Sequence, residues 1–291
     1  KLDGPAAGNG ALTITEDGEG VLWFGGSQGL SSWDGKTVRR FEKADGIPES
    51  DLTVLLPFPG DKIIAGSAGG RILLGDEDGF ETIGEPEALK HSWISGILPL
   101  SAKETWVSTL GSGLHLWDGK KWYSFDTDDG LPDSRLTCVL DDKRGYVWLG
   151  SLGGIIRAER AQLLARAKDR NARVQWLRLD HTDGLPSREC IGGYQPAGWR
   201  AKDGMLWFPT GSGIARVRPG FVEINKVAPP VYLQSVRANG VLHPGESGPV
   251  TTEPGRARLE FRFVGLSYSA PEKITSRARL AGLDDTWREL G

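Results

Sequence analysis

The sequence predicts an all-β protein, in which a β-propeller is followed by a second, smaller unit of β-strands. Three observations support this fold class. Glycine accounts for 41 of the 291 residues, about twice its usual share, and 11 tryptophans accompany it. A tryptophan motif recurs along the chain, and stretches of alternating polar and apolar residues surround each copy.

The recurring motif consists of a tryptophan, an apolar residue, several small residues, and a glycine followed by leucine or isoleucine. Its first residues are Trp23, Ile63, Trp106, Trp148 and Trp207, at intervals of 40, 43, 42 and 59 residues. Units of four short strands at a period of about 40–45 residues are typical of propeller blades. We therefore expect five four-stranded blades, with these five structural anchors packed between neighbouring blades.

The elements within one repeat follow in a fixed order. Repeats open on Asp-Gly-Ile-Pro or Asp-Gly-Leu-Pro, at residues 45–48, 129–132 and 183–186. An alternating stretch, an acidic turn, the anchor strand and an Asp-Gly hairpin come next, each of which favours short strands joined by tight turns. Residues 157–170 interrupt this order, because a segment rich in Ala, Leu, Glu and Arg without Gly or Pro predicts a helical insertion.

The repeat stops after Pro219, which divides the chain into propeller blades over residues 1–226 and a second unit over 227–291. Prolines mark the linker, and strands are predicted at Val231–Val236, Arg258–Phe263 and Ser276–Leu280. Asn239-Gly240 predicts a tight hairpin turn. We expect this unit to be incomplete at its C-terminal end.

Charge and cysteine content exclude several classes of partner. The chain has 35 basic and 38 acidic residues, a net charge of −3, so we expect no nucleic-acid partner. No stretch of 18 apolar residues occurs, so any membrane attachment would come through flanking segments. Cys138 and Cys190 are too few for a disulfide framework or a cysteine zinc site, and the sequence leaves open whether they pair.

No catalytic, metal or cofactor site is predicted. Gly25–Gly29 matches a Gly-x-Ser-x-Gly pattern, but the slot of Ser27 changes from repeat to repeat, which indicates a turn. The residues of Asp126–Gly130 are similar to the start of a calcium loop but lack its later ligands. The four histidines have no metal-ligand spacing; they are His91, His115, His181 and His243.

The segment from Arg188 to Arg200 departs furthest from the blade pattern. Aromatic stacking beside bidentate polar groups suits a sugar ring or a small acid, and propeller loops converge on the axial channel. The candidate ligand-binding residues are Arg188, Glu189, Gln195, Trp199 and Arg200. The alternative is that the segment only packs against the second unit or against further blades that this chain lacks.

These motifs resemble the two-component regulator propeller repeat family with its C-terminal three-tyrosine domain. The openers, the acidic turn before Trp148 and the Gly-Leu or Gly-Ile steps carry the resemblance, together with Leu266-Ser-Tyr268, Pro271 and Leu280–Trp287. The resemblance implies an immunoglobulin-like β-sandwich for the second unit. Members have more blades, so it also implies part of a larger propeller, and only Tyr268 of the expected tyrosines is present.

The resemblance further implies a function. It indicates a periplasmic, ligand-responsive sensor module of a bacterial signalling protein whose output is a histidine kinase or diguanylate cyclase. A small molecule or oligosaccharide is the expected ligand, and a homodimer is the expected state of the full-length protein. Two alternatives stay open, a carbohydrate-active propeller enzyme and a propeller scaffold that binds other proteins.

Overall fold

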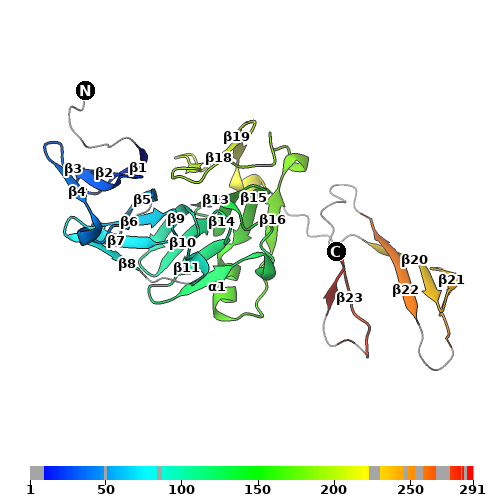
Figure 1. The fold of residues 1–291 in the computed structure, drawn as a ribbon. Helices are drawn as coiled ribbons and strands as arrows, with labels where there is room; N and C mark the ends of the chain where they lie inside the picture. The colour runs from blue at the N-terminus through cyan, green and yellow to red at the C-terminus, as the bar shows by residue number, and fades with distance from the viewer. Residues whose placement is uncertain are drawn as a thin grey trace. The chain divides into compact units, whose positions relative to one another are not determined.

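The structure, a computed structural model, divides the chain into two compact units, Lys1–Val222 and Glu223–Gly291 (Figure 1). It describes residues 10–48, 51–83, 87–222, 230–245, 248–252, 258–266, 276–282, 284 and 287–290. The predicted boundary between residues 226 and 227 lies outside the described residues. Each unit is considered separately below.

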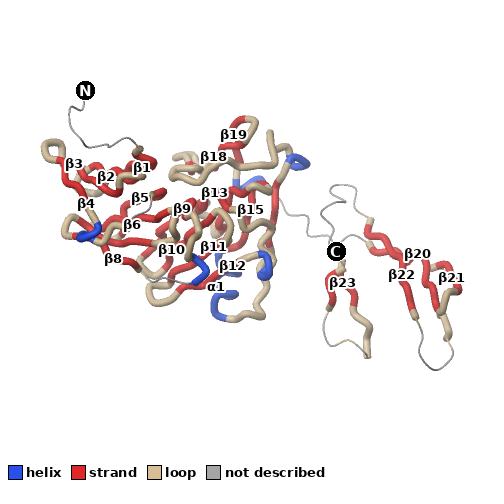
Figure 2. The backbone as a smooth tube through the Cα atoms, in the orientation of Figure 1, coloured by secondary structure: helices blue, strands red, loops and turns tan. Residues whose placement is uncertain are grey.

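Four antiparallel sheets of four strands follow one another in the first unit (Figures 1 and 2). Sheet 1 contains β1 (Ala11–Glu16), β2 (Leu22–Gly26), β3 (Gly29–Trp33) and β4 (Val38–Phe41). Sheet 2 contains β5 (Leu52–Phe58), β6 (Lys62–Ser67), β7 (Ile72–Asp76) and β8 (Gly79–Thr82). Sheet 3 contains β9 (Ile94–Ser101), β10 (Glu104–Thr109), β11 (Leu114–Trp117) and β12 (Trp122–Phe125). Sheet 4 contains β13 (Leu136–Asp141), β14 (Tyr146–Ser151), β15 (Gly154–Glu159) and β16 (Trp176–Leu179).

The fifth sheet differs from the prediction, because the described residues form three of its four predicted strands. It contains β17 (Trp199–Arg200), β18 (Leu206–Thr210) and β19 (Gly213–Val217). The chain leaves β19 through a short 3₁₀ turn at Pro219–Phe221, where the other sheets continue into an outer strand. Proline at the first position of that turn fixes its backbone and removes a donor that a further strand would need.

The sheets are arranged radially about a common axis. The first strand of each sheet packs against the first strand of the next, in the order β1, β5, β9, β13 and β17. Four of the five anchors are fully buried in the space between sheets, namely Trp23, Ile63, Trp106 and Trp148, each at most 1% exposed. Trp207 is half-buried, since it lies in the last sheet of the unit.

The opener motifs form compact 3₁₀ turns that lead from one sheet to the next. In the turn at Thr127–Asp129, the Asp126 carboxylate accepts hydrogen bonds from the backbone N–H groups of Asp128 and Asp129. Gly130 then adopts a φ of 83°, which glycine tolerates better than any other residue. The turns at Lys43–Asp45 and His181–Asp183 also end on a glycine of positive φ, Gly46 at 88° and Gly184 at 89°, so the Asp-Gly step has a geometric role.

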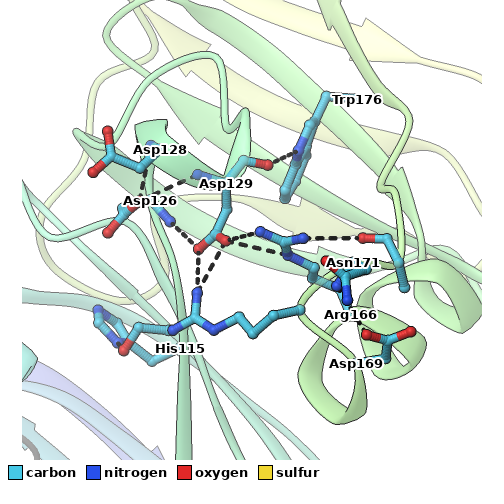
Figure 3. A network of polar contacts seen from close by, with 11 residues as sticks. His115, Asp126, Asp128, Asp129, Arg166, Asp169, Asn171 and Trp176 are labelled. Carbon is cyan, nitrogen blue, oxygen red and sulfur yellow. Dashed lines mark hydrogen bonds and ion pairs between the residues drawn. The ribbon is translucent and has the colours of Figure 1, made fainter. Parts of the chain in front are cut away.

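The inserted helix α1 (Arg160–Lys168) lies between β15 and β16 and is held against the second opener, residues 129–132 (Figure 3). Arg166 donates to Asp129 Oδ1 from both Nε, at 3.2 Å, and Nη2, at 2.6 Å. Arg170 and the indole of Trp176 also bond to Asp129. In the part of the chain that is described, no helix is long and apolar enough to cross a bilayer.

The second unit contains a three-stranded antiparallel sheet in the order β21, β20, β22, and a separate two-stranded sheet. Its strands are β20 (Val231–Ala238), β21 (Val241–Pro244), β22 (Leu259–Gly265), β23 (Arg277–Ala278) and β24 (Arg288–Glu289). Asn239 and Gly240 both have positive φ, 49° and 89°, as a tight hairpin turn requires. Tyr268 and Pro271 lie outside the described residues, and the immunoglobulin-like sandwich stays a prediction.

Candidate functional site

Five residues occupy the same position in the five sheets, next to the start of the innermost strand. The backbone carbonyl of each accepts a hydrogen bond from the turn after the second strand of its own sheet, with N···O distances of 2.8–3.3 Å. Because the innermost strands pack side by side in the order β1, β5, β9, β13 and β17, these residues follow one another along one end of the axis. We name them the axial ring: Gly10, Asp51, Trp93, Arg135 and Glu189.

The innermost strand of the fifth sheet is split by a loop. Cys190 forms an isolated bridge with Thr210, and the Ile191 N–H donates to Pro209 O at 2.8 Å. Pairing with β18 resumes only at Trp199, opposite Trp207. The seven intervening residues, 192–198, leave the sheet, and we name them the axial segment.

The axial segment reaches across to the innermost strands of two other sheets. The Gln195 N–H donates to Thr53 O on β5 at 3.1 Å. The Gln195 side chain forms two hydrogen bonds with the backbone of Ile97 on β9, accepting from N–H at 3.0 Å and donating to O at 3.4 Å. A single glutamine therefore connects sheets 2, 3 and 5 near the axis.

An aromatic pair stands where the axial segment meets the axial ring. The Trp93 indole Nε1 donates to Gly193 O at 2.5 Å. The Tyr194 ring packs edge-on against Trp93, with the centroids 5.4 Å apart and the planes at 81°. Tyr194 is 42% exposed, so one part of its ring contacts Trp93 and another part faces solvent.

Charged groups complete the ring. The Arg135 guanidinium forms a bidentate ion pair with Asp133, with both N···O distances at 3.0 Å. The hydrogen bond to Asp133 raises the pKa of Arg135, and the nearby charge of Glu189 adds to this. More than half of the Arg135 side chain is exposed. The ring thus offers aromatic faces and fixed charges of both signs to solvent.

The five residues expected to bind a ligand do not lie together. Arg188 and Glu189 precede the bridge to Thr210 at one end of β18, whereas Trp199 and Arg200 pair with Trp207 and Leu206 at the other end. Trp199 is 64% exposed and is not one of the five residues of the axial ring. Arg200 is half-buried, and its Nε has no hydrogen-bond partner within the described ranges.

The side chain of Gln195 is hydrogen-bonded to the backbone of Ile97, so it has a structural role. The segment therefore packs at Gln195, but the observed partners are sheets 2 and 3, which the packing alternative did not name. Sequence reasoning missed Asp51, Trp93, Arg135 and Tyr194. Three of them could have been found from the sequence, because Asp51, Trp93 and Arg135 are spaced by 42 residues, which is the period of the repeat.

A separate hollow of about 500 Å³ lies between the first opener and sheet 2. It shares no residue with the axial ring. The lining residues are Lys43, Gly46, Ile47, Pro48, Gly69, Arg71, Phe80 and Thr82. This hollow is therefore a candidate ligand site separate from the axial ring.

No protein-family model matches the sequence, and no curated protein matches it. Among solved structures, the chain is similar to an extracellular domain assigned to a hybrid two component system from B. thetaiotaomicron, with 18% identity and a TM-score of 0.56 over 74% of this chain and 27% of that chain. It is also similar to virginiamycin B lyase from Staphylococcus aureus, with 13% identity and a TM-score of 0.53 over 72% of this chain and 70% of that chain.

A streptogramin B lyase gives a TM-score of 0.51 at 18% identity, over 72% of this chain and 68% of that chain. The chain spans less than half the length of the two-component extracellular domains that it resembles. At these identities the likeness concerns the fold alone. Together with the radial packing of the five sheets, it confirms the predicted β-propeller.

Proposed function

We propose that this chain is the extracytoplasmic, ligand-sensing part of a bacterial signalling protein of the two-component type, and that the axial ring with Tyr194 binds the ligand. The observation that carries the proposal is the convergence of Trp93, Arg135, Glu189 and Tyr194 at one end of the propeller axis. The fold shared with an extracellular domain of a hybrid two component system supports it. The repeat motifs quoted above support it independently.

The chemistry of the ring suits a saccharide or another small polar molecule. The exposed part of Tyr194 offers an aromatic face for the C–H groups of a sugar ring. Arg135 is already oriented by Asp133, so its remaining N–H groups can bind hydroxyl or carboxylate oxygens with little loss of side-chain entropy. Glu189 provides an acceptor for hydroxyl donors.

The axial segment gives ligand binding a route to the rest of the domain. Tyr194 lies next to Gln195, which holds sheets 2 and 3. A ligand that contacts both the ring and Tyr194 would favour the arrangement in which these sheets are joined to sheet 5. Signalling requires that the ligand bind this arrangement more tightly than another, because only a difference in affinity shifts an equilibrium. We further propose that the full-length protein is a homodimer and that its output domain is a histidine kinase or a diguanylate cyclase.

The test is a binding experiment on the purified chain. We would screen oligosaccharides and small organic acids by thermal shift and measure the affinity of each stabilising compound by calorimetry. Tyr194→Ala and Arg135→Gln should each weaken binding by about tenfold or more, the effect expected for losing one good contact. The matched control is Lys120→Gln, in the exposed hairpin between β11 and β12, which should leave the affinity unchanged.

Two results would contradict the proposal. One is binding that survives both ring variants but is lost on Thr82→Trp, which would move the site to the hollow beside sheet 2. The other is chemical turnover of a bound compound, with product formation that depends on an acidic residue, which would favour a propeller enzyme.

A further inference from the structure

The two cysteines of the chain face the same buried space between sheets 4 and 5. Cys138 lies on β13, the innermost strand of sheet 4, and Cys190 begins the split innermost strand of sheet 5. Cys138 is 3% exposed and Cys190 0% exposed. Both are free thiols within one apolar cluster, which also contains Trp148, Ile155 and Leu206.

Gly150 explains why the two side chains can approach each other. Cys138 pairs with Gly150 across β13 and β14. A Cβ atom at Gly150 would lie 2.7 Å from Thr137 Oγ1, 2.9 Å from Cys138 Sγ and 3.3 Å from Cys190 Cβ, so the two cysteines border the same small space beside this glycine. The Cys190 Sγ–H donates to Gly154 O, 3.8 Å away, and this weak contact is lost when the disulfide forms.

We propose that Cys138 and Cys190 form an intramolecular disulfide when the chain folds in the presence of a small-molecule disulfide such as oxidised glutathione. The reaction is two successive thiol–disulfide exchanges. One cysteine thiolate attacks the glutathione disulfide, forming a mixed disulfide and releasing one glutathione. The second cysteine thiolate attacks the mixed disulfide and releases the other, so two cysteine thiols and one glutathione disulfide give one protein disulfide and two glutathione thiols.

The timing of the exchange follows from burial. Burial raises the pKa of Cys138 to about 12 and that of Cys190 to about 11, so neither is a thiolate in the closed fold near neutral pH. Exchange therefore takes place before sheet 5 has docked on sheet 4. Once formed, the bond ties the start of the axial segment to β13 and closes a long loop, which stabilises the fold mainly by restricting the unfolded chain.

The inference does not depend on the proposed function, since it concerns only this chain and an added oxidant. The experiment refolds the whole chain with mixed oxidised and reduced glutathione, and in parallel with a phosphine reductant alone. Alkylation in denaturant then counts the free thiols, and tryptic digestion without reduction should reveal peptide 136–143 joined to peptide 189–200.

The expected product has no alkylatable thiol, is about 2 Da lighter than the reduced chain, and melts at a higher temperature than the reduced chain. Cys138→Ser and Cys190→Ser refolded in the same mixture should show no such gain, and each should keep one thiol or one bound glutathione. If the wild-type chain instead keeps two thiols, carries two glutathiones, or forms only disulfide-linked dimers, the proposal is wrong. If the Cys138–Cys190 disulfide forms but lowers the melting temperature, the disulfide does not stabilise the fold.

Discussion

The indole Nε1 of Trp148 donates a hydrogen bond to Oδ2 of Asp142, six residues earlier, at 3.0 Å. Trp23 and Asp17 repeat the relationship in the first sheet at 2.7 Å. The same carboxylate also accepts from backbone N–H groups of the turn, such as those of Arg144 and Tyr146 for Asp142. The acidic turn therefore satisfies the one polar atom of an otherwise apolar anchor, so that the indole can be buried without an unpaired donor.

Replacing this acid should destabilise the propeller. Asp142→Ala leaves the buried Trp148 N–H and two turn N–H groups without their acceptor, and we expect a loss of about 2–4 kcal/mol in the free energy of unfolding. Urea titration measures it. The matched control is Asp203→Ala, in the exposed turn before β18, where the carboxylate accepts from Met205 N–H and the loss should be below about 1 kcal/mol. Equal losses in the two variants would contradict the role assigned to Asp142.

The opener glycines can be tested in the same way. Gly46 and Gly35 have nearly the same φ, 88° and 92°, but a Cβ at Gly46 would overlap the carbonyl oxygen of Phe80 in sheet 2, whereas nothing lies near Gly35. Gly35→Ala should cost about 1 kcal/mol from backbone strain alone. Gly46→Ala should cost clearly more, because the two sheets must also move apart. Thermal melting of both variants compares them, and a Gly46 variant no less stable than the Gly35 variant would rule out close packing at this turn.

The helical insertion offers a buried ion pair beside an exposed one. The side chains of Arg166 and Arg170 are 20% and 77% exposed, and both bond to the buried carboxylate of Asp129 (Figure 3). Arg166→Ala should lower the free energy of unfolding by about 1–3 kcal/mol, since a buried charge loses its main partner. Arg170→Ala should cost less than about 0.5 kcal/mol, as exposed pairs do. Denaturant titrations at low and high salt measure both losses. If Arg170→Ala lowers the free energy of unfolding more than Arg166→Ala does, this ranking is wrong.

Periodicity made most of the fold predictable. The anchors fixed the number of sheets, and the openers fixed their limits, because each of these motifs must satisfy the same local geometry in every blade. The prediction of four strands in the fifth sheet rested on analogy with the other sheets. Within the described residues three strands form, because the chain turns at Pro219–Phe221 after β19. Trp207 lies in the last sheet of the unit, and it also lacks the acid of its counterparts: the residue six positions earlier is Ala201, whose side chain has no acceptor for the indole.

The candidate site was less predictable than the fold. One pattern in the spacing was available: 17 residues separate Leu131 from Trp148, but 22 separate Leu185 from Trp207, and the difference marks the axial segment. What that segment contacts could not be inferred, because Thr53 and Ile97 are more than 90 residues away in sequence. The axial ring could have been found from the 42-residue spacing of Asp51, Trp93 and Arg135, whose side chains share no chemistry.

The link between sheets at Gln195 predicts a specific instability. Gln195→Ala removes both hydrogen bonds to the Ile97 backbone and should cost about 1–3 kcal/mol in the free energy of unfolding. Gln195→Glu should cost at least as much, because a carboxylate cannot donate to Ile97 O and its charge is partly buried. Urea titration and limited proteolysis within residues 192–198 measure the two effects. The exposed Gln175→Ala serves as control, and cleavage of the segment at the wild-type rate in the Gln195 variants would show that other contacts hold it.

His115 predicts how stability depends on pH. It is fully buried on β11, with Nδ1 hydrogen-bonded to Ser124 Oγ at 3.0 Å and Nε2 without a partner among the described residues. Burial lowers its pKa from 6.5 to about 4, although the backbone of Ser112 and the charge of Asp126 oppose the shift. Below pH 6.5 the unfolded chain therefore binds a proton that the folded chain does not, so the free energy of unfolding falls as the pH falls toward 4.

This single group should remove up to about 3 kcal/mol between pH 6.5 and pH 4, and nothing further below pH 4, where both states are protonated. His115→Leu should flatten the dependence in this window, although the variant loses the Ser124 hydrogen bond and starts from a lower stability at pH 7. Urea titrations of both proteins from pH 7 to pH 4 give the comparison. Parallel curves would show that His115 titrates normally in the folded protein, and that the dependence arises from the carboxylates of the acidic turns instead.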